Sequence, residues 1–404
     1  MAKITVLGGC GAVGSVAVRT LAKADEFTEI VIADINVEKA GKIAEELGSK
    51  VKAVKVDALD PASIKSAIAG SDIVLNTTGP YYKFVPTVLK AVIESKINYI
   101  DVCDDYDVTI DILKMSDAAA QAGITACIGL GSSPGTTNLL AKFAADNLLD
   151  ETESIDIYHA HGGEPIEGEG VIGHRFHCMT SDVPMFLDGE LKYVKFFEPD
   201  GIALQEEVEF YRLGDKIRVY PYPHPEQITM PQYVKAKRVT NKGTVLPEEY
   251  YELTKDLVRH GMASREPVNV KGVEVVPYDF ALAYIVRERD RILERVNFGS
   301  QRGCVKVVVA GTKDGKPGKF VFQLASESEA LGEGTGIPAA MGCMLMAAGK
   351  ITKKGVYPPE GCVNPLDFLG LVDKVMPKGE TEKSFDGVLV QSIDENGNVT
   401  KLDF

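Results

Sequence analysis

The sequence predicts an α/β protein in which a doubly wound parallel sheet comes first and an α+β domain follows. Two observations carry this prediction. Short apolar strands alternate with helical segments up to about residue 128, which is typical of a parallel sheet with crossover helices. From about residue 154 the pattern changes to longer alternating segments, which indicate a mostly antiparallel sheet.

The first strand and helix enclose a glycine-rich turn. Residues 3–7 read as a short apolar strand, and residues 12–24 have apolar positions at helical spacing. Residues 9–14, where the strand passes into the helix, read GCGAVG, a complete G-x-G-x-x-G. Gly9 allows the tight turn, Gly11 lets a pyrophosphate approach the backbone, and Gly14 lets the helix pack closely on the strand. The N–H groups at the helix start then face the phosphates. The context predicts a Rossmann dinucleotide-binding domain.

The second strand, residues 29–33, ends at Asp34, where a carboxylate usually accepts the adenosine ribose hydroxyls. No arginine follows to bind a 2′-phosphate, which favours NAD(H), with NADP(H) as the alternative cofactor. Asp34 could instead be the N-cap of the helix predicted at 37–47, but Asn36 is equally able to cap that helix. We therefore expect Asp34 to contact the cofactor.

Four more strands complete the predicted sheet, at residues 51–56, 72–77, 98–102 and 124–128, with later helices at 85–95 and 108–121. Asp57 follows the third strand, over the expected adenine pocket. Asp60 and Pro61 supply the N-cap and first-turn proline of the next helix. Ligands of such sheets bind beyond the carboxyl ends of the strands, so the loops after strands four, five and six are the informative ones.

The loop after the fourth strand contains polar groups for the reacting end of a dinucleotide. Thr78 and Gly79 would lie beside the nicotinamide ribose, and Tyr81 and Lys83 near the reacting ring. A Gly-Pro turn with surface tyrosines is the alternative interpretation.

The next two loops are also polar. After the fifth strand, carboxylates around Asp104 could bind a substrate amine, although Asp105 or Asp107 could simply cap the next helix. After the sixth strand, residues 129–138 open another helix, whose N-terminus is a second potential anion site.

The second half of the chain has the pattern of an α+β domain. The predicted strands are 154–161, 174–180, 216–220, 234–239, 304–311 and 318–324, with helices at 247–260 and 279–295. The proline-rich segment 221–231 has no period and is expected to be a loop. Residues 335–338 open a helix that is apolar nearly all round and therefore buried, and 375–404 resemble a strand pair around Asn396-Gly397.

Composition excludes several classes of function. A net charge of −14 argues against nucleic acid and anionic membranes as partners. The seven cysteines form no C-x-x-C motif and read as reduced thiols, which we expect of a cytoplasmic enzyme. No stretch approaches the length of a transmembrane helix, and the first residues enter a strand directly instead of a signal sequence.

The histidines need separate weighing. His159 and His161 share one face of a predicted strand, and His174 and His177 follow on the next. Two such pairs could bind zinc, but no cysteine or carboxylate at ligand spacing completes a site, so we expect no metal. A proton shuttle at His161 is the better functional interpretation, because the charge of imidazole changes near neutral pH. An ordinary structural histidine is the alternative.

Several short motifs together resemble the saccharopine dehydrogenase-like family. Besides the glycine motif they are VD-x-x-D at 56–60, TGPY at 78–81, YID at 99–101, SPG-x-x-N at 133–138, HGG-x-P at 161–165 and TGIPAA at 335–340. The resemblance implies a dinucleotide-binding domain over 1–135 and an inserted α+β substrate and dimerisation domain over 136–330. It also implies a segment 331–404 whose helix returns to the first domain, and a homodimer.

The activity that the resemblance implies is reversible hydride transfer between nicotinamide and the carbon–nitrogen bond of an amino-acid-derived substrate, through an imine. An iminium needs little acid catalysis, so the protein mainly has to orient it and exclude water. A non-catalytic NAD(P)-binding protein that responds to the redox state is the alternative.

Single residues carry over from the family. Tyr81 matches a tyrosine near the reacting carbon in saccharopine reductases. Ser133 and His161 stand where those enzymes usually have aspartate and cysteine, which weakens the case for saccharopine itself as the substrate. Arg175 matches a segment that contributes a ligand for the substrate carboxylate, which it would pair bidentately.

The expected site residues fall into three groups. The expected catalytic residues are Tyr81, Ser133 and His161. The expected substrate ligands are Lys83, Asp104, His174 and Arg175. The expected cofactor ligands are Gly9, Gly11, Ala12, Val13, Gly14, Asp34, Asp57, Thr78 and Gly79.

Overall fold

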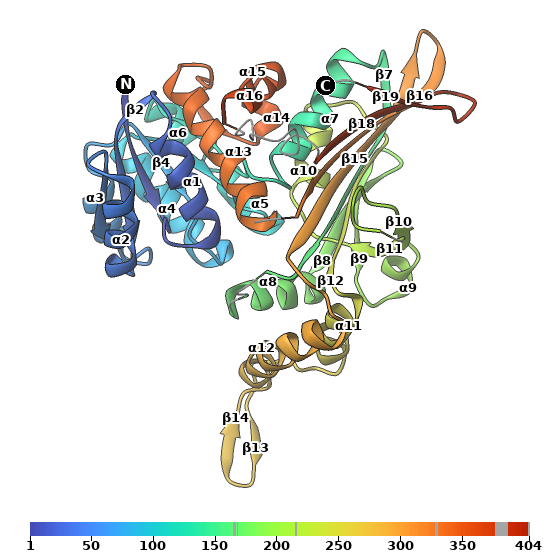
Figure 1. Ribbon diagram of the computed structural model, residues 1–404, viewed down its shortest axis with the longest axis horizontal. Coiled ribbons are helices and arrows are strands. Elements are labelled where there is room, and N and C mark those ends of the chain that lie inside the picture. Colours follow the sequence, from blue (N-terminus) through green and yellow to red (C-terminus); the bar gives the residue numbers. More distant parts are fainter. Residues whose placement is uncertain (165–166, 168, 215, 328–329, 376–386, 403–404) are drawn as a thin grey trace.

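The computed structural model describes residues 1–164, 167, 169–214, 216–327, 330–375 and 387–402. Two sheets stand side by side, a seven-stranded one with helices on both faces and a ten-stranded one (Figure 1). A thin arm projects from the second part.

The first sheet is parallel throughout, with strand order β17-β6-β5-β4-β1-β2-β3. Its strands are β1 (Ala2–Leu7), β2 (Phe27–Asp34), β3 (Val51–Lys55), β4 (Ile73–Asn76), β5 (Asn98–Asp101), β6 (Thr125–Cys127) and β17 (Gly355–Tyr357). The helices between them are α1 (Ala12–Ala22), α2 (Val37–Leu47), α3 (Pro61–Ile68), α4 (Tyr81–Ser95), α5 (Tyr106–Leu113) and α6 (Ser116–Gln121). The predicted doubly wound sheet is confirmed. The seventh strand, β17, was not predicted.

The glycine turn between β1 and α1 is very tight. Gly8, one residue before the motif, has a φ of +74°, so it is the residue that takes the left-handed conformation. A Cβ on Gly14 would lie 2.3 Å from the Gly8 carbonyl oxygen, and a Cβ on Gly9 would lie 2.9 Å from Ile32. Close packing of helix on strand therefore requires both glycines.

The second sheet is mixed, with order β10-β11-β12-β7-β15-β16-β18-β19, and β8 and β9 extend it beside β12. Its strands are β7 (Glu151–Gly162), β8 (Asp182–Leu187), β9 (Glu190–Lys195), β10 (Glu206–Val208), β11 (Ile217–Pro221), β12 (Arg238–Leu246), β15 (Arg302–Lys313), β16 (Lys316–Ser326), β18 (Val388–Ile393) and β19 (Val399–Leu402). β7 and β12 are parallel, and the other pairs are antiparallel. The strand predicted at 234–239 begins later, at Arg238.

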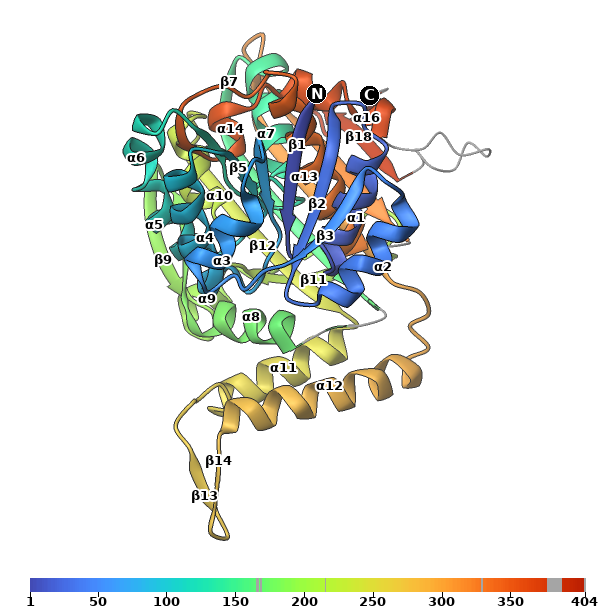
Figure 2. The same ribbon diagram turned by 90° about the vertical axis from the view of Figure 1, so that its left-hand side faces the viewer.

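One predicted strand is wrong. Residues 174–180 belong to the helix α8 (Glu169–Thr180), which lies against α11 (Glu248–Arg259) and α12 (Pro277–Arg295) (Figure 2). The buried residues of α8 recur at helical spacing, and they include the side chain of Arg175. Because an arginine and two glycines interrupt the apolar pattern, periodicity alone did not indicate this helix.

Two helices connect the two sheets. α7 (Thr136–Asn147) leads from the first sheet to the second, and α13 (Ala330–Ala347) returns from the second sheet and packs along α1 (Figure 1). A Cβ on Gly336 of α13 would lie 2.6 Å from the Val13 carbonyl oxygen, so the two helices touch backbone to backbone. The predicted return of the apolar helix is confirmed.

Shorter elements complete the chain. They are α9 (Pro199–Ile202), α10 (Glu226–Thr229), η1 (Met230–Gln232), α14 (Pro359–Cys362), α15 (Pro365–Leu369) and α16 (Val372–Val375). The strand pair predicted within 375–404 is present as β18 and β19, and residues 376–386 lie outside the described residues.

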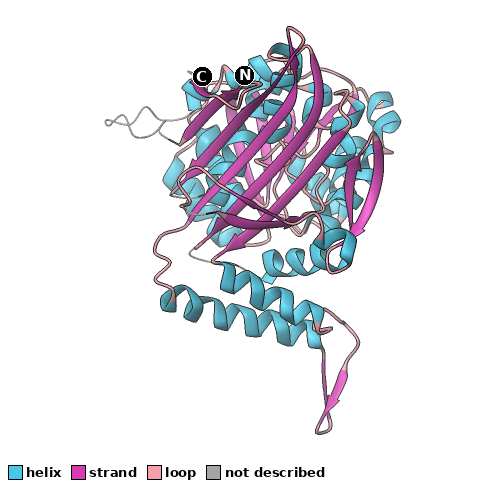
Figure 3. Ribbon diagram, turned by 90° about the vertical axis from the view of Figure 1, so that its right-hand side faces the viewer, coloured by secondary structure: helices cyan, strands magenta, loops and turns pink. Residues whose placement is uncertain are grey.

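The projecting arm is a two-stranded ribbon, β13 (Val268–Val270) and β14 (Val273–Val275), at the end of α11 and α12 (Figure 3). Val268 pairs with Val275 and Val270 with Val273, so all four valines lie on one face. Val268, Val270 and Val273 are 53%, 49% and 63% exposed. Among the described helices, none combines the length and apolarity that a membrane crossing needs.

Candidate active site

Asp34 lies at the edge of the glycine turn. Its Oδ2 accepts a hydrogen bond from the Cys10 N–H at 3.0 Å, and its Oδ1 accepts one from the Asn36 N–H at 2.9 Å. The Asn36 side chain accepts from the Lys39 N–H at 3.0 Å and so caps α2. The Asp34 carboxylate is therefore not the N-cap of α2. It lies where we expect the adenosine ribose.

The loop after β4 lies directly beside the same turn. The Thr77 hydroxyl donates to the Leu7 carbonyl at 2.9 Å, and a Cβ on Gly8 would lie 3.0 Å from the Thr78 hydroxyl oxygen. That Thr78 hydroxyl is buried without a hydrogen-bond partner among the described residues. A buried hydroxyl with spare capacity, beside the start of α1, suits a cofactor phosphate or ribose. Asp57, by contrast, uses its Oδ1 to accept the Leu59 N–H within its own loop.

Tyr81 and Lys83 start α4, just past Gly79, but point into different surroundings. Burial raises the pKa of Tyr81 well above its ordinary value, and the charge of Asp104 raises it further. Its hydroxyl therefore keeps its proton at neutral pH. Lys83 is exposed, and its Nζ lies 5.3 Å from the centre of the Phe84 ring. The structure brings Tyr81 toward Asp104 and leaves Lys83 at the surface.

His174 of α8 meets two carboxylates from the loop after β5. Its Nδ1 lies 3.1 Å from Asp105 Oδ1, and its Nε2 lies 3.7 Å from Asp104 Oδ2 and 3.3 Å from the Cys178 sulfur. Burial lowers the pKa of His174, but the negative potential of Cys178, Asp104 and Asp105 outweighs it and holds that pKa well above its ordinary value. The Asp105 Oδ2 also accepts the Tyr82 N–H at 2.9 Å. The contacts of His174 with Asp104 and Asp105 join the two parts of the chain.

The same place contains two arrangements of side chains that could hold a metal ion. Ligand atoms of Asp104, Asp105 and His174 lie within 4.8 Å of one another, and so do those of Asp105, Asp107 and His177. The sequence spacing indicated no carboxylate near these histidines, because the contact crosses between domains. The imidazolium charge of His174 already balances the carboxylates, and the expectation of no metal stays a prediction.

Ser133 lies in a buried polar cluster that the sequence did not indicate. Its hydroxyl donates to Glu226 Oε1 at 2.6 Å and accepts from Asn241 Nδ2 at 3.0 Å, and His224 Nδ1 lies 3.3 Å away. Glu226 is 0% exposed and also accepts the Thr137 hydroxyl at 3.2 Å. Burial raises the pKa of Glu226, but His224 and these hydrogen bonds outweigh it, so the carboxyl is ionised.

His161 is held in an ion pair. Its Nδ1 lies 2.6 Å from Glu164 Oε1. Burial lowers the pKa of His161, but the carboxylate outweighs it and the net pKa is raised. For Glu164, burial raises the pKa and the His161 charge lowers it more, to about 2. The Nδ1 of the predicted proton shuttle is therefore already engaged by a carboxylate, and its catalytic role stays a prediction.

Arg175 lies beneath the site, on α8. It is 2% exposed, forms an ion pair with Glu167, and lies 5.1 Å above the centre of the Tyr250 ring. Arg289 shares the same carboxylate at 3.0 Å. The Nη1 of Arg175 is buried without a hydrogen-bond partner in the described part of the chain. One edge of the guanidinium is thus available for a second carboxylate.

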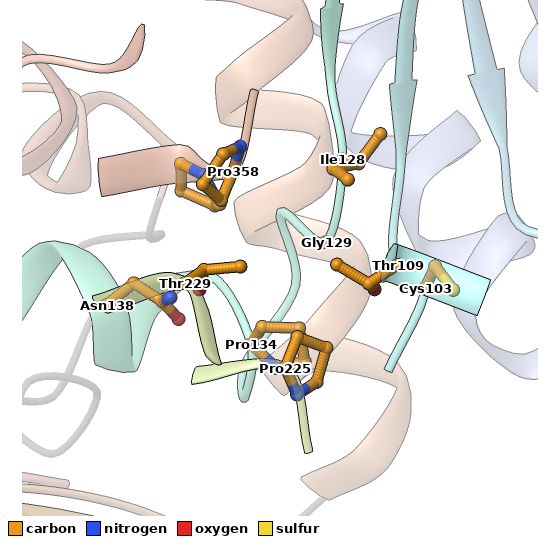
Figure 4. Close-up of a pocket in the computed structure, with 10 residues that line it drawn as sticks. Cys103, Thr109, Ile128, Gly129, Pro134, Asn138, Pro225, Thr229 and Pro358 are labelled. Atoms are coloured by element: carbon orange, nitrogen blue, oxygen red, sulfur yellow. The ribbon is translucent and has the colours of Figure 1, made fainter. Parts of the chain in front are cut away.

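A small pocket marks where the three parts of the chain meet (Figure 4). Its empty volume is about 190 Å³, and this volume includes space that is open to solvent. It is lined by Cys103, Thr109, Ile128, Gly129, Pro134, Asn138, Pro225, Thr229, Pro358 and Pro359. In Figure 4 the rings of Pro134 and Pro225 lie together, next to the Ser133 cluster in sequence. The pocket is too small for a dinucleotide, and we assign it a packing role.

Comparison with known proteins identifies the family. Residues 4–127 match the family described as the saccharopine dehydrogenase NADP binding domain. The carboxyaminopropylagmatine dehydrogenase of Synechocystis is 25% identical over 394 residues, which cover 91% of this chain and 94% of that protein. Residues 4–127 thus form a saccharopine dehydrogenase-type NADP-binding domain, and the chain is similar to such a relative over nearly its whole length. The carboxynorspermidine synthase of Vibrio cholerae is also 25% identical, over 89% of this chain and 92% of its own.

A solved structure confirms the fold of this saccharopine dehydrogenase-like protein. Apo saccharopine dehydrogenase (L-Glu forming) from Saccharomyces cerevisiae aligns over 99% of this chain and 100% of its own, with a TM-score of 0.67 and 17% identity. The predicted family, the fold class and the NAD(P)-dependent oxidoreductase are confirmed. Nothing in these findings supports the non-catalytic alternative. A nicotinamide cofactor is confirmed, and the name of the matched domain leans toward NADP.

Proposed function

We propose that this protein reduces the imine formed between a polyamine-like amine and an amino-acid semialdehyde, or oxidises the resulting secondary amine. The observation that carries the proposal is a site with one negative and one positive end. Asp104 Oδ1 and Arg175 Nη1 are buried polar atoms without a hydrogen-bond partner among the described residues. They are suited to an ammonium group and a carboxylate of one substrate.

The relatives support this substrate class. The names carboxyaminopropylagmatine dehydrogenase and carboxynorspermidine synthase both describe an amine chain that carries an amino-acid-like end. The acidic loop after β5 fits the amine chain, since Asp104 and Asp105 bring two carboxylates to one place. Arg175 fits the amino-acid end.

The residues then have the following roles in our proposal. Tyr81 keeps its proton and orients the reacting carbon from the loop after β4. The Ser133 hydroxyl, which donates to Glu226 and accepts from Asn241, offers its remaining lone pair to a substrate ammonium. The glycine turn would hold the cofactor through Gly9, Gly11, Ala12, Val13, Gly14, Asp34 and Thr78, and the bound nicotinamide would supply or accept the hydride. His161 is held by its ion pair with Glu164 and forms part of the wall of the substrate pocket.

For the cofactor we propose a preference for NAD(H). The Asp34 carboxylate beside the turn would accept ribose hydroxyls and repel a 2′-phosphate. The description of the matched domain points the other way, so the two cofactors should be titrated side by side by fluorescence. Tighter binding of NADPH than of NADH would contradict this assignment of Asp34.

The substrate proposal can be tested directly. Purified protein, NADH or NADPH, and a four-carbon amino-acid semialdehyde are mixed with agmatine, 1,3-diaminopropane or lysine, and cofactor oxidation is followed at 340 nm. We expect turnover with agmatine or the diamine and little with lysine. No oxidation with any amine, by a protein that binds the cofactor, would contradict the proposal.

We further propose a homodimer, the domain boundaries 1–135, 136–330 and 331–404, and a cytoplasmic location. The valine face of the arm and the uncovered face of the second sheet (Figure 3) support a second copy as partner. All seven cysteines are free, which supports a reducing compartment.

A further inference from the structure

We propose that His159, rather than His161, is the residue that exchanges a proton with the substrate nitrogen. This inference rests on the proposed function, because it names the acid–base group of that reaction. The sequence offered both histidines on one strand face, and only the structure separates their surroundings.

The residue opposite His159 on the neighbouring strand is a glycine, whose missing side chain leaves space for the imidazole ring. His159 of β7 pairs with Gly243 of β12. A Cβ on Gly243 would lie 1.9 Å from the imidazole, so only glycine permits this ring position. The ring therefore lies flat across β12 instead of pointing away from the sheet.

Aromatic neighbours hold the ring in this orientation. It stacks on His224 with ring centres 5.2 Å apart and planes 10° apart, and the Tyr222 ring meets it edge-on at 4.7 Å. Tyr222 meets His224 in the same way, at 5.0 Å. Because His224 also lies 3.3 Å from the Ser133 hydroxyl, this stack is continuous with the loop after β6.

The His159 Nε2 atom is buried and has no hydrogen-bond partner within the described ranges. Buried polar atoms are almost always satisfied, so an unpaired one in a cluster of polar side chains indicates a place for a ligand. His161 differs, since its Nδ1 is already paired with Glu164 at 2.6 Å.

The charge states agree with this division. Burial lowers the pKa of His159 well below its ordinary value, and His224 and His161 lower it further, as does His174, whereas the Asn241 side chain opposes them. The net pKa of His161 is raised. At neutral pH His159 is therefore a neutral acceptor, whereas the carboxylate of Glu164 favours the protonated form of His161.

In the amine-oxidising direction the step balances as follows. The secondary ammonium of the substrate loses one proton to His159 Nε2, which breaks an N–H bond on the substrate and forms one on the imidazole. The freed lone pair on nitrogen then forms the carbon–nitrogen double bond as the hydride leaves the adjacent carbon with its electron pair, and the oxidant NAD(P)⁺ of the proposed reaction would accept that hydride. In the reducing direction His159 returns the proton to the new amine.

The test compares His159→Gln with His161→Gln, using carboxynorspermidine and NAD(P)⁺, across pH 4 to 9. We expect His159→Gln to lower kcat by about 100-fold or more and to remove the acidic limb of the kcat profile. His161→Gln should keep that limb, with its effect mainly on KM. Cofactor binding, measured by fluorescence, shows that each variant is folded. A parent-like pH profile in His159→Gln would overturn the inference, whereas an inactive parent contradicts the proposed function.

A second measurement does not depend on activity or on a variant. The ¹⁵N NMR spectrum of histidine-labelled parent protein is recorded at pH 6 with NAD(P)⁺, with and without carboxynorspermidine. We expect one neutral histidine whose Nε2 signal moves toward the protonated position when the amine binds. If every histidine that responds to the amine is already protonated without it, the inference is wrong.

Discussion

At the scale of single residues, Glu226 is held by several contacts at once. It is fully buried, ionised, and bound to Ser133 and Asn241. We expect Glu226→Gln to lower kcat/KM by about 10- to 100-fold, because one charge-assisted hydrogen bond that holds Ser133 is weakened. Cofactor affinity should not change. Steady-state kinetics with fluorescence titration checks this, and equal losses in the matched variant Ser133→Ala and in the double variant would show that the two residues act together.

Asp34 carries the second prediction at this scale. Asp34→Ser removes the carboxylate and should weaken NADH binding by about 10-fold, while NADPH binding improves because a negative charge is lost. Asp25→Asn, an exposed change just before the opposite end of β2, is the control. Both affinities can be measured by cofactor fluorescence. An unchanged ratio of the two affinities in Asp34→Ser would show that this carboxylate does not select the cofactor.

The ion pair of His161 and Glu164 predicts a pH-dependent stability. The folded pKa of Glu164, about 2, lies below its ordinary 4.5, so its contribution is complete above about pH 4.5 and is lost as the pH falls toward 2. The pKa of His161 is raised above 6.5, so its contribution is complete below about pH 6.5 and is lost as the pH rises through the folded pKa.

Glu164→Gln should therefore be destabilised most between about pH 4.5 and pH 6.5, by ~1–3 kcal/mol, because a partly buried imidazole loses its acceptor. Thermal unfolding of parent and variant across this range measures the difference. A constant difference from pH 5 to pH 9 would mean that the pair does not contribute through its charge.

At the scale of elements, the contact of α13 with α1 is one that a single methyl group can disturb. A Cβ on Gly336 would lie 2.6 Å from the Val13 carbonyl oxygen, whereas on Gly334 of the same helix its first contact is 3.7 Å away. Gly336→Ala should cost about 1–3 kcal/mol through overpacking and should weaken cofactor binding at the start of α1. Gly334→Ala should be neutral or stabilising, since alanine favours helix. Denaturant unfolding of the two variants measures the change in the free energy of unfolding that each substitution causes.

The same scale shows what the sequence could and could not predict. The sequence predicts the glycine turn, the place of Asp34 and the alternation of strands and helices up to β6, because each of these signals lies within a few neighbouring residues. α8 was misread because Arg175 is buried by an ion pair with Glu167, which no pattern of apolar residues reports. β17 was missed because a three-residue strand depends on its partner, β6, for its conformation.

At the scale of the whole molecule, the arm is the feature that a single copy leaves unexplained. A two-stranded ribbon is marginally stable in water, and this one exposes valines on one face. Replacing Val268, Val270, Val273 and Val275 by threonine keeps the β-propensity and removes the apolar face. We expect the dimer to weaken by at least 10-fold in sedimentation experiments, with cofactor binding retained. A parent protein that sediments as a monomer would contradict the proposed homodimer.

The whole molecule also explains why half of the site escaped the sequence. Ser133 and Glu226 are 93 residues apart, and the proline-rich segment that carries Glu226 and His224 has no period to place it. His174 meets Asp104 and Asp105 only because α8 belongs to the second sheet and its partners to the first. Family motifs named Ser133, His161 and Arg175 as candidates, but their partners required the assembled fold.

The course of the chain has a consequence for folding during synthesis. β17 and α13 belong to the last quarter of the sequence, yet one completes the edge of the first sheet and the other covers α1. When the first six strands leave the ribosome, the apolar side of α1 and the edge of β6 are still uncovered. The nucleotide-binding domain can finish folding only after almost the entire chain has emerged, so a nascent chain stalled near residue 330 should remain sensitive to protease and bound by chaperones.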